Sequence, residues 1–499
     1  MSQSIKLGKF ERFFVLNKNI LMVSFNTEPW HLSVTVETIM KEIELKKKVT
    51  WFLLDYLSLD NKVLPLSSNL RSREIRRLIH KLVKSDLRFK ANVNIVDSVN
   101  LISTPHKDTK RSEEVARAEL ISRLRDSNPC LTHNLRALKQ YSQIYLDLNR
   151  FFIDYLSKNT FEKAYVFNGR PLCERAFDDA ASTRLQKVEY FETFNENWAD
   201  RYFIFKKPTH SVSYRSKVME KFSLSEEVKN SKKYKNISSS WFDQRIAGLT
   251  QSYTKHQMSS SELSRKKPYY VFFHSSQDEL DMVGLTDSYW GNQMEILKIL
   301  VRIFKAQSNY DLILRIHPHL KYKSQRDQNI WSKVGENLQT KYPWFTYFGP
   351  MNSVSSYDLV RQAHGVITSG STIGVEAVYL KKSSILIGDA FHKYMGITIN
   401  PTSIRELADL INHSKQITNS EKSFNAALRY GYFHSQGGLK FNFVQYNGKN
   451  QYSVKTFRIS YSWYLRALRR LELRMVSINI KTKLRRCDCD NWIDSSARW

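Results

Sequence analysis

Residues 365–388 read GVITSGSTIGVEAVYLKKSSILIG, and this stretch indicates how the second half of the chain folds. It predicts a short buried strand at 365–368, a turn of small residues, a helix that runs to Tyr379 and another strand at 384–387. A strand, a helix and a second strand in this order form the repeating unit of parallel α/β sheets.

The same alternation continues upstream of this stretch. Strands are expected at 269–273, 311–316 and 344–348, and helices at 292–306, 331–342 and 355–363. Strands separated by helices at this spacing predict one parallel sheet, and we expect it to form a lobe over residues 268–436.

The first part of the chain predicts a second lobe of the same kind. A strand at 20–25, a helix at 32–45 and a strand at 49–56 begin it, and strands at 164–167 and 188–191 follow. The predicted fold class is therefore α/β with two Rossmann-like lobes. The expected domains are a lobe at 1–200, a polar interlobe segment at 201–267, the lobe at 268–436 and a basic tail at 437–499.

Composition narrows the possible partners and the location. The 499 residues are 41% hydrophobic, and 77 Lys and Arg face 48 Asp and Glu, for a net charge of +29. Disorder throughout is excluded, and the charge implies an anionic partner. The first residues lack the apolar core of a signal peptide, and no apolar run is long enough to span a bilayer. We expect the chain to stay in the cytoplasm.

The cysteines point to neither a metal site nor a disulfide framework. Cys130 and Cys173 are isolated, and Cys487 and Cys489 form a CDCD run without a second Cys or His pair. Zinc sites need such a second pair. We predict a reducing compartment, no metal and no cofactor.

The small-residue turn of the opening stretch is the strongest candidate site. Backbone N–H groups at the start of a helix attract anions, and small residues let a phosphate approach them. The turn comprises Ser369, Gly370, Ser371 and Thr372, and Glu376 lies one turn further on, where a carboxylate can accept hydrogen bonds from a ribose. An ordinary helix cap is the equally weighted alternative.

Two more motifs follow strands that are expected to end at the same edge of this sheet. Arg315 and His317 stand in RIHPH, where an imidazolium or a guanidinium would neutralise a phosphate leaving group, unless His317 is a structural histidine, as a lone His more often is. Ser275, Ser276 and Glu279 follow the first strand of the lobe, where they either touch the ligand or cap the next helix.

The first lobe offers a turn and three candidate bases. Asn168, Gly169 and Arg170 follow a strand, and Arg170 would bind an acidic acceptor or a pyrophosphate, unless it is only a surface residue of a tight turn. A general base for an acceptor hydroxyl is expected to be Glu28, His31 or Glu192, because each of these residues follows a strand.

Two basic helices are expected outside these motifs. Residues 71–90 predict a basic helix. The favoured interpretation is a solvent-exposed helix face, and the alternative is a contact with an anionic acceptor or lipid. Residues 461–475 place Tyr and Leu on one face of a helix and Arg on the other. Such a helix lies on an anionic membrane or docks its apolar face on the first lobe. A peripheral place on the inner face of the cytoplasmic membrane follows from the first option.

Taken in order, these motifs resemble those of bacterial capsule-polysaccharide and lipopolysaccharide glycosyltransferases. The resemblance rests on Asn168-Gly169-Arg170, FFHSSQDE at 272–279, RIHPH at 315–319 and SGSTIGVEA at 369–377, and it covers about residues 160–400. The His-Pro pair is similar to that of enzymes that use CMP-activated acidic sugars, such as Kdo transferases and polysialyltransferases.

The resemblance implies a GT-B arrangement of the two lobes, with His317 on the nucleotide phosphate and with Ser371, Thr372 and Glu376 on phosphate or ribose. The chain departs from the family where Lys381-Lys382-Ser383-Ser384 replaces the usual Gly before the last strand. The family pattern also leaves the base in the first lobe unassigned.

The predicted function is transfer of a sugar from a nucleotide sugar, with a CMP-linked acidic sugar favoured, to a surface polysaccharide or a lipid-linked glycan. A sugar-nucleotide epimerase of similar architecture is the enzymatic alternative, and a catalytically inactive scaffold is another. A nucleic-acid-binding protein would explain the net charge of +29. The chain lacks the helix-turn-helix, zinc-finger and RNP motifs of such proteins, so no nucleic-acid partner is expected.

Overall fold

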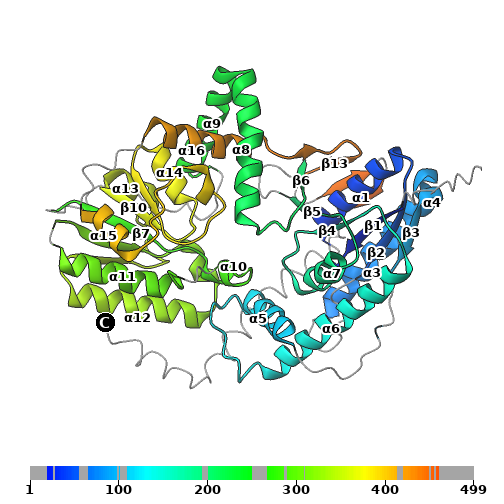
Figure 1. Ribbon diagram of the computed structural model, residues 1–499, viewed down its shortest axis with the longest axis horizontal. Helices are drawn as coiled ribbons and strands as arrows, with labels where there is room; N and C mark the ends of the chain where they lie inside the picture. Colours follow the sequence, from blue (N-terminus) through cyan, green and yellow to red (C-terminus); the bar gives the residue numbers. More distant parts are fainter. Residues whose placement is uncertain are drawn as a thin grey trace, which may run out of the picture.

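Two α/β lobes lie side by side in the computed structural model of this chain, joined by helices (Figure 1). The structure describes residues 19–25, 28–54, 66–97, 101, 109–193, 200–249, 267–285, 289–307, 309–412, 420–448, 451–454 and 457–459.

The N-terminal lobe is built on a seven-stranded sheet with the strand order β12-β6-β5-β4-β1-β2-β3. The strands from β3 to β5 are parallel, while β6 and β12 run antiparallel at one edge. The strands are β1 Asn19–Ser24, β2 Lys48–Leu53, β3 Val93–Val96, β4 Lys163–Phe167, β5 Val188–Thr193, β6 Arg201–Phe205 and β12 Leu439–Lys440.

Helices cover both faces of this sheet, which explains why its central strands are continuous apolar runs. Alternate residues of β1 enter opposite cores: Leu21 packs with the helices on one face, and Met22 packs with those on the other. One face is covered by α5 Lys110–Leu124, α6 Leu135–Lys158 and α7 Leu172–Ser182, and the other by α1 Pro29–Glu44, α3 Leu66–Ser85 and α4 Leu87–Asn92.

The C-terminal lobe carries a five-stranded sheet in which all strands are parallel, with the order β11-β10-β7-β8-β9. The strands are β7 Tyr269–Phe273, β8 Asp311–Arg315, β9 Phe345–Phe348, β10 Gly365–Thr368 and β11 Ser383–Leu386. One face packs on α11 Gln293–Ala306, α12 Gln325–Lys341 and α15 Ile404–Asn412, and the other on α13 Ser356–Gln362 and α14 Ile373–Tyr379. The predicted fold class of two Rossmann-like lobes is confirmed.

Three helices connect the lobes: α8 Val212–Lys229, α9 Ser231–Ile246 and α16 Glu421–Gln436. Figure 1 shows α8 and α9 as an antiparallel pair that rises beside α16. The Ser223 hydroxyl donates to the Arg429 carbonyl at 2.8 Å, and Arg429 forms an ion pair with Glu227 at 3.0 Å. Both contacts tie α8 to α16.

The N-terminal lobe extends beyond residue 200, where it was expected to end. β6 pairs with β5, so the first residues of the expected interlobe segment belong to the first sheet. Two helices also differ from their predicted bounds. α1 begins at Pro29 rather than at 32, because proline suits the first turn of a helix, and α14 begins only at Ile373.

The chain returns to the N-terminal lobe after α16. A small antiparallel sheet of β13 Val444–Tyr446, β14 Tyr452–Val454 and β15 Phe457–Ile459 packs against α1. The buried Glu37 carboxylate of α1 accepts the backbone N–H groups of Asn442, Phe443 and Val444 at 2.9, 2.8 and 3.1 Å. The predicted amphipathic helix at 461–475 lies outside the described residues, as do Cys487 and Cys489. Within the described part of the chain, no helix combines the length and the apolar character needed to cross a bilayer.

A methyl group on Gly335 would overlap the ring of Tyr347, because α12 lies close against β9 at this residue. We expect Gly335→Ala to lower the melting temperature, since overpacking costs about 1–3 kcal/mol and the gain in helix propensity is about 1 kcal/mol. The second substitution Tyr347→Leu should restore part of the loss by making room. Differential scanning fluorimetry on the two variants measures both effects, and an unchanged melting temperature for Gly335→Ala would contradict the close packing.

Candidate functional site

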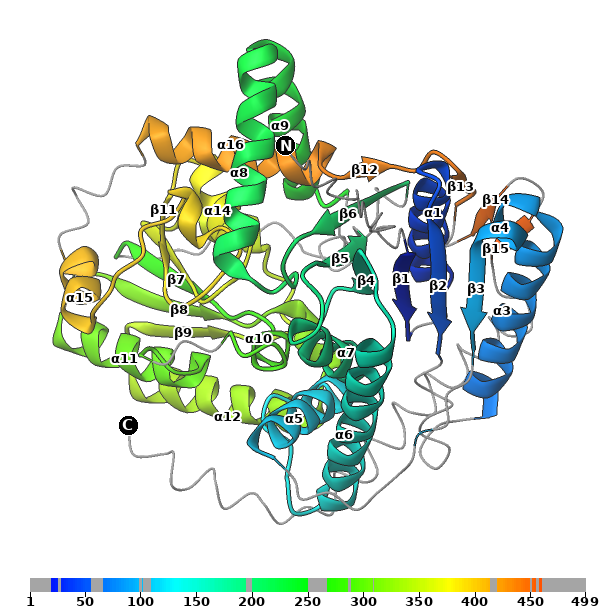
Figure 2. The same ribbon diagram turned by 45° about the vertical axis from the view of Figure 1, so that its right-hand side comes forward.

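A cleft of about 770 Å³ lies between the two lobes. On the N-terminal side, α5 and α7 line it, and on the C-terminal side the lining comes from the start of α11 and from α10 Gln277–Asp281. Figure 2 shows α5 and α7 facing α10 across this region. Clefts of this size accommodate small-molecule ligands, and domain interfaces are a common place for them.

Three predicted motifs meet where the strands of the C-terminal sheet end. His274, Ser275 and Ser276 after β7 and His317 after β8 line one cavity. The Ser275 hydroxyl oxygen lies 3.5 Å from that of Ser369, which follows β10. Parallel strands have their carboxyl ends at one edge of the sheet, which is where open α/β sheets bind ligands.

Burial disfavours the predicted imidazolium form of His317. Its Nδ1 accepts the backbone N–H of His319 at 3.1 Å, and the proton of the ring is then on Nε2. Burial lowers the pKa of His317 to about 3, and the neighbouring His319, Lys323 and Arg315 add to the effect. His317 therefore offers a hydrogen-bond donor and no positive charge.

Arg315 turns away from the expected phosphate position. Its guanidinium donates to the carbonyls of Gly349 at 2.6 Å, Asn352 at 3.0 Å and Val354 at 3.3 Å, all in the loop between β9 and α13. The residue is 1% exposed. Burial lowers the pKa of Arg315 to about 10, so the side chain stays cationic at neutral pH. Its role in this structure is to hold a loop rather than to meet a leaving group.

The turn after β10 has a backbone conformation that would let a phosphate come close to its N–H groups. Gly370 has φ +131°, a conformation that favours glycine, and a Cβ there would lie 3.3 Å from the Asp389 carbonyl oxygen. The Ser371 hydroxyl accepts the Ile373 N–H at 3.4 Å. Ser369 is buried, with its hydroxyl facing that of Ser275.

Glu376 has an ion-pair partner that the sequence did not indicate. Arg245 of α9 donates from Nε to the Glu376 carboxylate at 2.8 Å and from Nη2 to the Thr372 hydroxyl at 3.4 Å. Arg245 and Glu376 are 131 residues apart, so no local motif connects them. A ribose at this position would have to share the carboxylate with Arg245.

His274 and Lys323 were not predicted as site residues. Both ring nitrogens of His274 are buried and have no hydrogen-bond partner within the described part of the chain, and burial lowers the pKa of His274 to about 3. Lys323 donates to Asp278 at 2.8 Å and to Glu279 at 3.3 Å. Lys323 therefore supplies the cation beside His317, and Glu279 helps to position it.

The predicted turn after β4 reaches the end of β5. Asn168 accepts the Arg170 N–H through Oδ1 at 3.0 Å and donates to the Glu192 carboxylate at 3.1 Å. Gly169 has φ +73° and lies against the Tyr190 ring. Burial raises the pKa of Glu192, while Arg170 and Arg215 oppose the shift. Asn168, Arg170 and Glu192 thus form one group.

The other two candidate bases lie at the start of α1. His31 is 3% exposed, and its ring centroid lies 3.6 Å from those of Trp30 and of Phe167. Burial lowers the pKa of His31 well below its ordinary value. An enclosed neutral ring is a core residue, so His31 is poorly placed for catalysis. Glu28 directly precedes α1 and is partly exposed.

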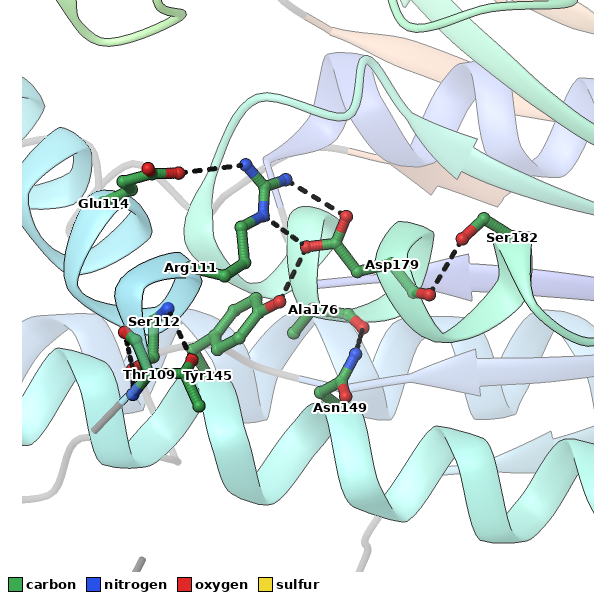
Figure 3. Close-up of polar contacts among 9 residues, drawn as sticks. All are labelled: Thr109, Arg111, Ser112, Glu114, Tyr145, Asn149, Ala176, Asp179 and Ser182. Atoms are coloured by element: carbon green, nitrogen blue, oxygen red, sulfur yellow. Dashed lines mark hydrogen bonds and ion pairs between the residues drawn. The ribbon is translucent and has the colours of Figure 1, made fainter. Parts of the chain in front are cut away.

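Arg111 is a further charged residue of the cleft that the sequence did not single out. Asp179 accepts from Nε and Nη2 of Arg111 at 2.8 and 3.0 Å, and the same carboxylate accepts from the Tyr145 hydroxyl at 2.6 Å (Figure 3). The Asp179 hydrogen bond raises the pKa of Arg111. The guanidinium is held in place and largely neutralised by this carboxylate.

The lobes touch next to the His317 cavity. Ser127, after α5, donates from its backbone N–H and its hydroxyl to the Asp327 carboxylate at 3.0 and 2.9 Å. Arg175 of α7 donates to the Met282 carbonyl at 2.5 Å. Ser127 also lines the cavity, so the first lobe completes its wall. Among the described residues, no three His, Cys, Asp or Glu side chains are arranged to hold a metal ion.

Comparison with known families assigns the second half of the chain. Residues 203–436 match the family of capsule polysaccharide biosynthesis proteins. The matched region begins with β6 and ends with α16, so it contains the C-terminal sheet and the connecting helices. Over this region the chain is similar to capsule polysaccharide biosynthesis proteins, as the motifs predicted, and the two-lobe fold agrees with the predicted GT-B type. No curated protein matches the sequence of the chain.

Solved structures resemble the chain only distantly. The Thermosulfurimonas dismutans KpsC β-Kdo 2,4-transferase is 11% identical, with 54% of this chain and 79% of that chain covered and a TM-score of 0.35. The β-Kdo 2,7-transferase of the same KpsC is 15% identical, with coverages of 56% and 80% and a TM-score of 0.34. A glycosyltransferase from Rickettsia africae is 11% identical, with coverages of 84% and 93% and a TM-score of 0.30. Similarity at this level carries no conclusion about the reaction.

Proposed function

We propose that this chain transfers a sugar from a nucleotide-activated donor to a cell-surface polysaccharide or a lipid-linked glycan. The observation that carries the proposal is that Ser275, His317 and Ser369 converge at one edge of the C-terminal sheet, within the capsule-family region. A CMP-linked acidic sugar is the favoured donor because of the resemblance of the His-Pro pair. The donor is a co-substrate, and the proposal includes no further cofactor or metal.

The C-terminal lobe would stabilise the departing phosphate. When the bond between the anomeric carbon and the phosphate oxygen breaks, negative charge develops on that oxygen. His317 and the Ser275 and Ser369 hydroxyls supply hydrogen-bond donors at the strand ends, where preorganised donors lower the barrier. Because His317 is neutral, its Nε2–H acts as a donor without needing acidic pH.

The N-terminal lobe would supply the base. The acceptor hydroxyl attacks the anomeric carbon, a new carbon–oxygen bond forms, and a carboxylate takes the hydroxyl proton. Glu192 is favoured over Glu28 and His31, because burial raises the pKa of Glu192 and makes the carboxylate a stronger base. The contacts of Ser127 and Arg175 with the other lobe keep the two halves of the site together.

The place of action is part of the proposal. The chain works in the cytoplasm, and a peripheral position on the inner face of the cytoplasmic membrane depends on the basic segment at 461–475. A flotation assay with anionic vesicles, using the chain with and without residues 461–499, tests that position.

The first experiment is thermal stabilisation of the full chain by CMP, UDP, GDP, ADP and TDP. A ligand present at 100 times its Kd stabilises the native state by about 2.7 kcal/mol, which raises the melting temperature by about 5 °C or more in a domain of this size. We expect one nucleotide to give this shift and His317→Ala to reduce its affinity at least tenfold. Glu376→Gln should reduce it too, because the carboxylate is close to Thr372 of the turn.

His364→Ala is the matched control, since His364 precedes β10 at the opposite edge of the same sheet. It should leave the nucleotide response unchanged. If no nucleotide stabilises the chain, or if His317→Ala and His364→Ala behave alike, the proposed donor site is wrong. A UDP response combined with turnover of UDP-GlcNAc in the absence of any acceptor would favour the epimerase alternative.

A further inference from the structure

We propose that the N-terminal side of the cleft holds an anion-binding site for an acidic acceptor, built from Arg170, Arg175, Arg215 and His210. This inference rests on the proposed transferase function and names the chemistry of the acceptor. The group bound is a carboxylate or a phosphate, carried by an acidic glycan or by a lipid-linked saccharide.

The four side chains come from two segments, 170–175 and 210–215, and two of them, Arg175 and His210, line the cleft. Arg170 follows β4, next to Gly169, which lines the cleft. Arg175 lies in the first turn of α7, His210 just precedes α8, and both line the cleft directly. Arg215 lies in the first turn of α8, where its guanidinium is 4.2 Å from the ring of Phe391 in the other lobe.

Among the described residues the arginines have few partners: Arg175 donates to the Met282 carbonyl, and Arg215 donates to the Thr209 carbonyl at 3.4 Å. The Nε atoms of Arg170 and Arg215 and the Nδ1 atom of His210 are buried without a hydrogen-bond partner among the described residues. The described residues also place no carboxylate within ion-pair distance of Arg170, Arg175 or Arg215. An unmet buried polar group costs about 1–3 kcal/mol, and more if it is charged, so such a group calls for an explanation, and a bound anion would provide one here.

The nearby carboxylates are engaged with other groups. Asp179 is bound by Arg111 and Tyr145 (Figure 3), and Asp178 is bound by the Tyr190 hydroxyl. Glu192 accepts from the Asn168 amide and from the Thr193 N–H, and it offsets only part of the charge. Asp179 therefore offsets the charge of Arg111, whereas no carboxylate is ion-paired with the arginines of the proposed site among the described residues.

Neighbouring positive charges disfavour the charged forms of His210 and Arg215. Burial lowers the pKa of His210 to about 4, and the positive charges of Arg175, Arg170 and Arg111 add to this shift. Burial also lowers the pKa of Arg215 to about 10, with Arg170 as the next contribution. An anion in their midst would relieve this repulsion, and guanidinium groups bind carboxylates and phosphates in a bidentate manner.

The test is calorimetric titration of the full chain with three probes: trigalacturonic acid, inorganic phosphate and neutral maltotriose. We expect at least one anionic probe to bind and maltotriose not to bind. Trigalacturonic acid indicates an acidic sugar as the recognised group, and inorganic phosphate indicates a lipid-linked phosphate. Arg170→Gln should weaken anion binding at least tenfold. Arg170→Lys should weaken it less, because lysine keeps the positive charge but loses the bidentate hydrogen bonds of the guanidinium.

Arg184→Gln is the matched control, since it removes an exposed arginine just after the same helix α7. It should change neither affinity nor stability. Arg170→Gln should keep or raise the melting temperature of the free chain, because it relieves repulsion; a structural arginine would show the opposite. If Arg170→Gln does not fold, Arg215→Gln gives an independent measurement of anion affinity, and an unchanged affinity in that variant would overturn the site.

Three outcomes would overturn the site: no anion binds, Arg170→Gln and Arg184→Gln weaken binding equally, or Arg170→Gln abolishes the stabilisation by nucleotides. The last outcome would assign the arginines to the donor phosphate. Nucleotide stabilisation in the wild type without anion binding would leave the proposed function intact and remove this inference. Specific anion binding without any nucleotide response would leave the anion site intact and remove the proposed function.

Discussion

Replacing Arg315 with Met is expected to destabilise the C-terminal lobe by about 3 kcal/mol, because hydrogen bonds to a charged group contribute about 1.5–3 kcal/mol. The guanidinium donates hydrogen bonds to the carbonyls of Gly349, Asn352 and Val354. In the variant these partly buried carbonyls would lose their donor. The melting temperature should fall by about 6–12 °C. Hydrogen exchange in residues 349–354 should accelerate more than in the rest of the lobe.

Arg302→Met is the control for this prediction, because Arg302 is an exposed arginine of the same lobe. It should change the melting temperature by less than about 1 °C, as surface substitutions cost little. The result also separates two roles of Arg315. If Arg315→Met keeps its stability and loses only the nucleotide response, then the guanidinium does meet the phosphate, and the role as a loop support is wrong.

Replacing Glu37 with Ala is expected to free the segment after α16 from the N-terminal lobe. The carboxylate accepts three consecutive backbone N–H groups, at Asn442, Phe443 and Val444, and it is 0% exposed. We expect a loss of about 3 kcal/mol or more, because three buried donors lose their acceptor together. Hydrogen exchange and limited proteolysis should increase over residues 441–459, and the melting temperature should fall.

Glu44→Ala is the matched control, since Glu44 is an exposed carboxylate at the end of the same helix. It should leave both the exchange and the proteolysis pattern unchanged. Equal protection of residues 441–459 in Glu37→Ala and Glu44→Ala would show that apolar packing, rather than the carboxylate, holds the small sheet. That packing joins Val444, Tyr452 and Val454 to the core beside α1.

The two proposals concern two neighbouring places with different chemistry. The small cavity of the C-terminal lobe offers mainly neutral donors, because burial disfavours the charged form of His317 and Lys323 is paired with Asp278. The N-terminal side of the cleft offers arginines whose Nε atoms, at Arg170 and Arg215, have no hydrogen-bond partner among the described residues. Such a division would let the cavity bind the nucleotide phosphate through preorganised hydrogen bonds and the arginines bind an acidic acceptor through charge.

Local pattern was sufficient for the lobes and for the edge of the sheet that carries the candidate site. The apolar runs of β7, β8 and β10 and the small or polar residues that follow them are visible within about ten residues each, so the strand ends were predicted correctly. The return of the chain to the N-terminal lobe was not predicted, because β12 is short and pairs with β6, which lies far away in sequence.

By itself, the sequence determined the fold class, the family relationship and the places where polar residues follow buried strands, because these depend on periodicity and on short motifs. Only the tertiary structure decided the charge and the partners of those residues. Burial makes His317 neutral, loop carbonyls occupy Arg315, and Arg245 pairs with Glu376. The physical reason is that desolvation and pairing depend on neighbours that folding brings together from segments 34 residues apart, for Arg315 and Gly349, to 131 residues apart, for Arg245 and Glu376.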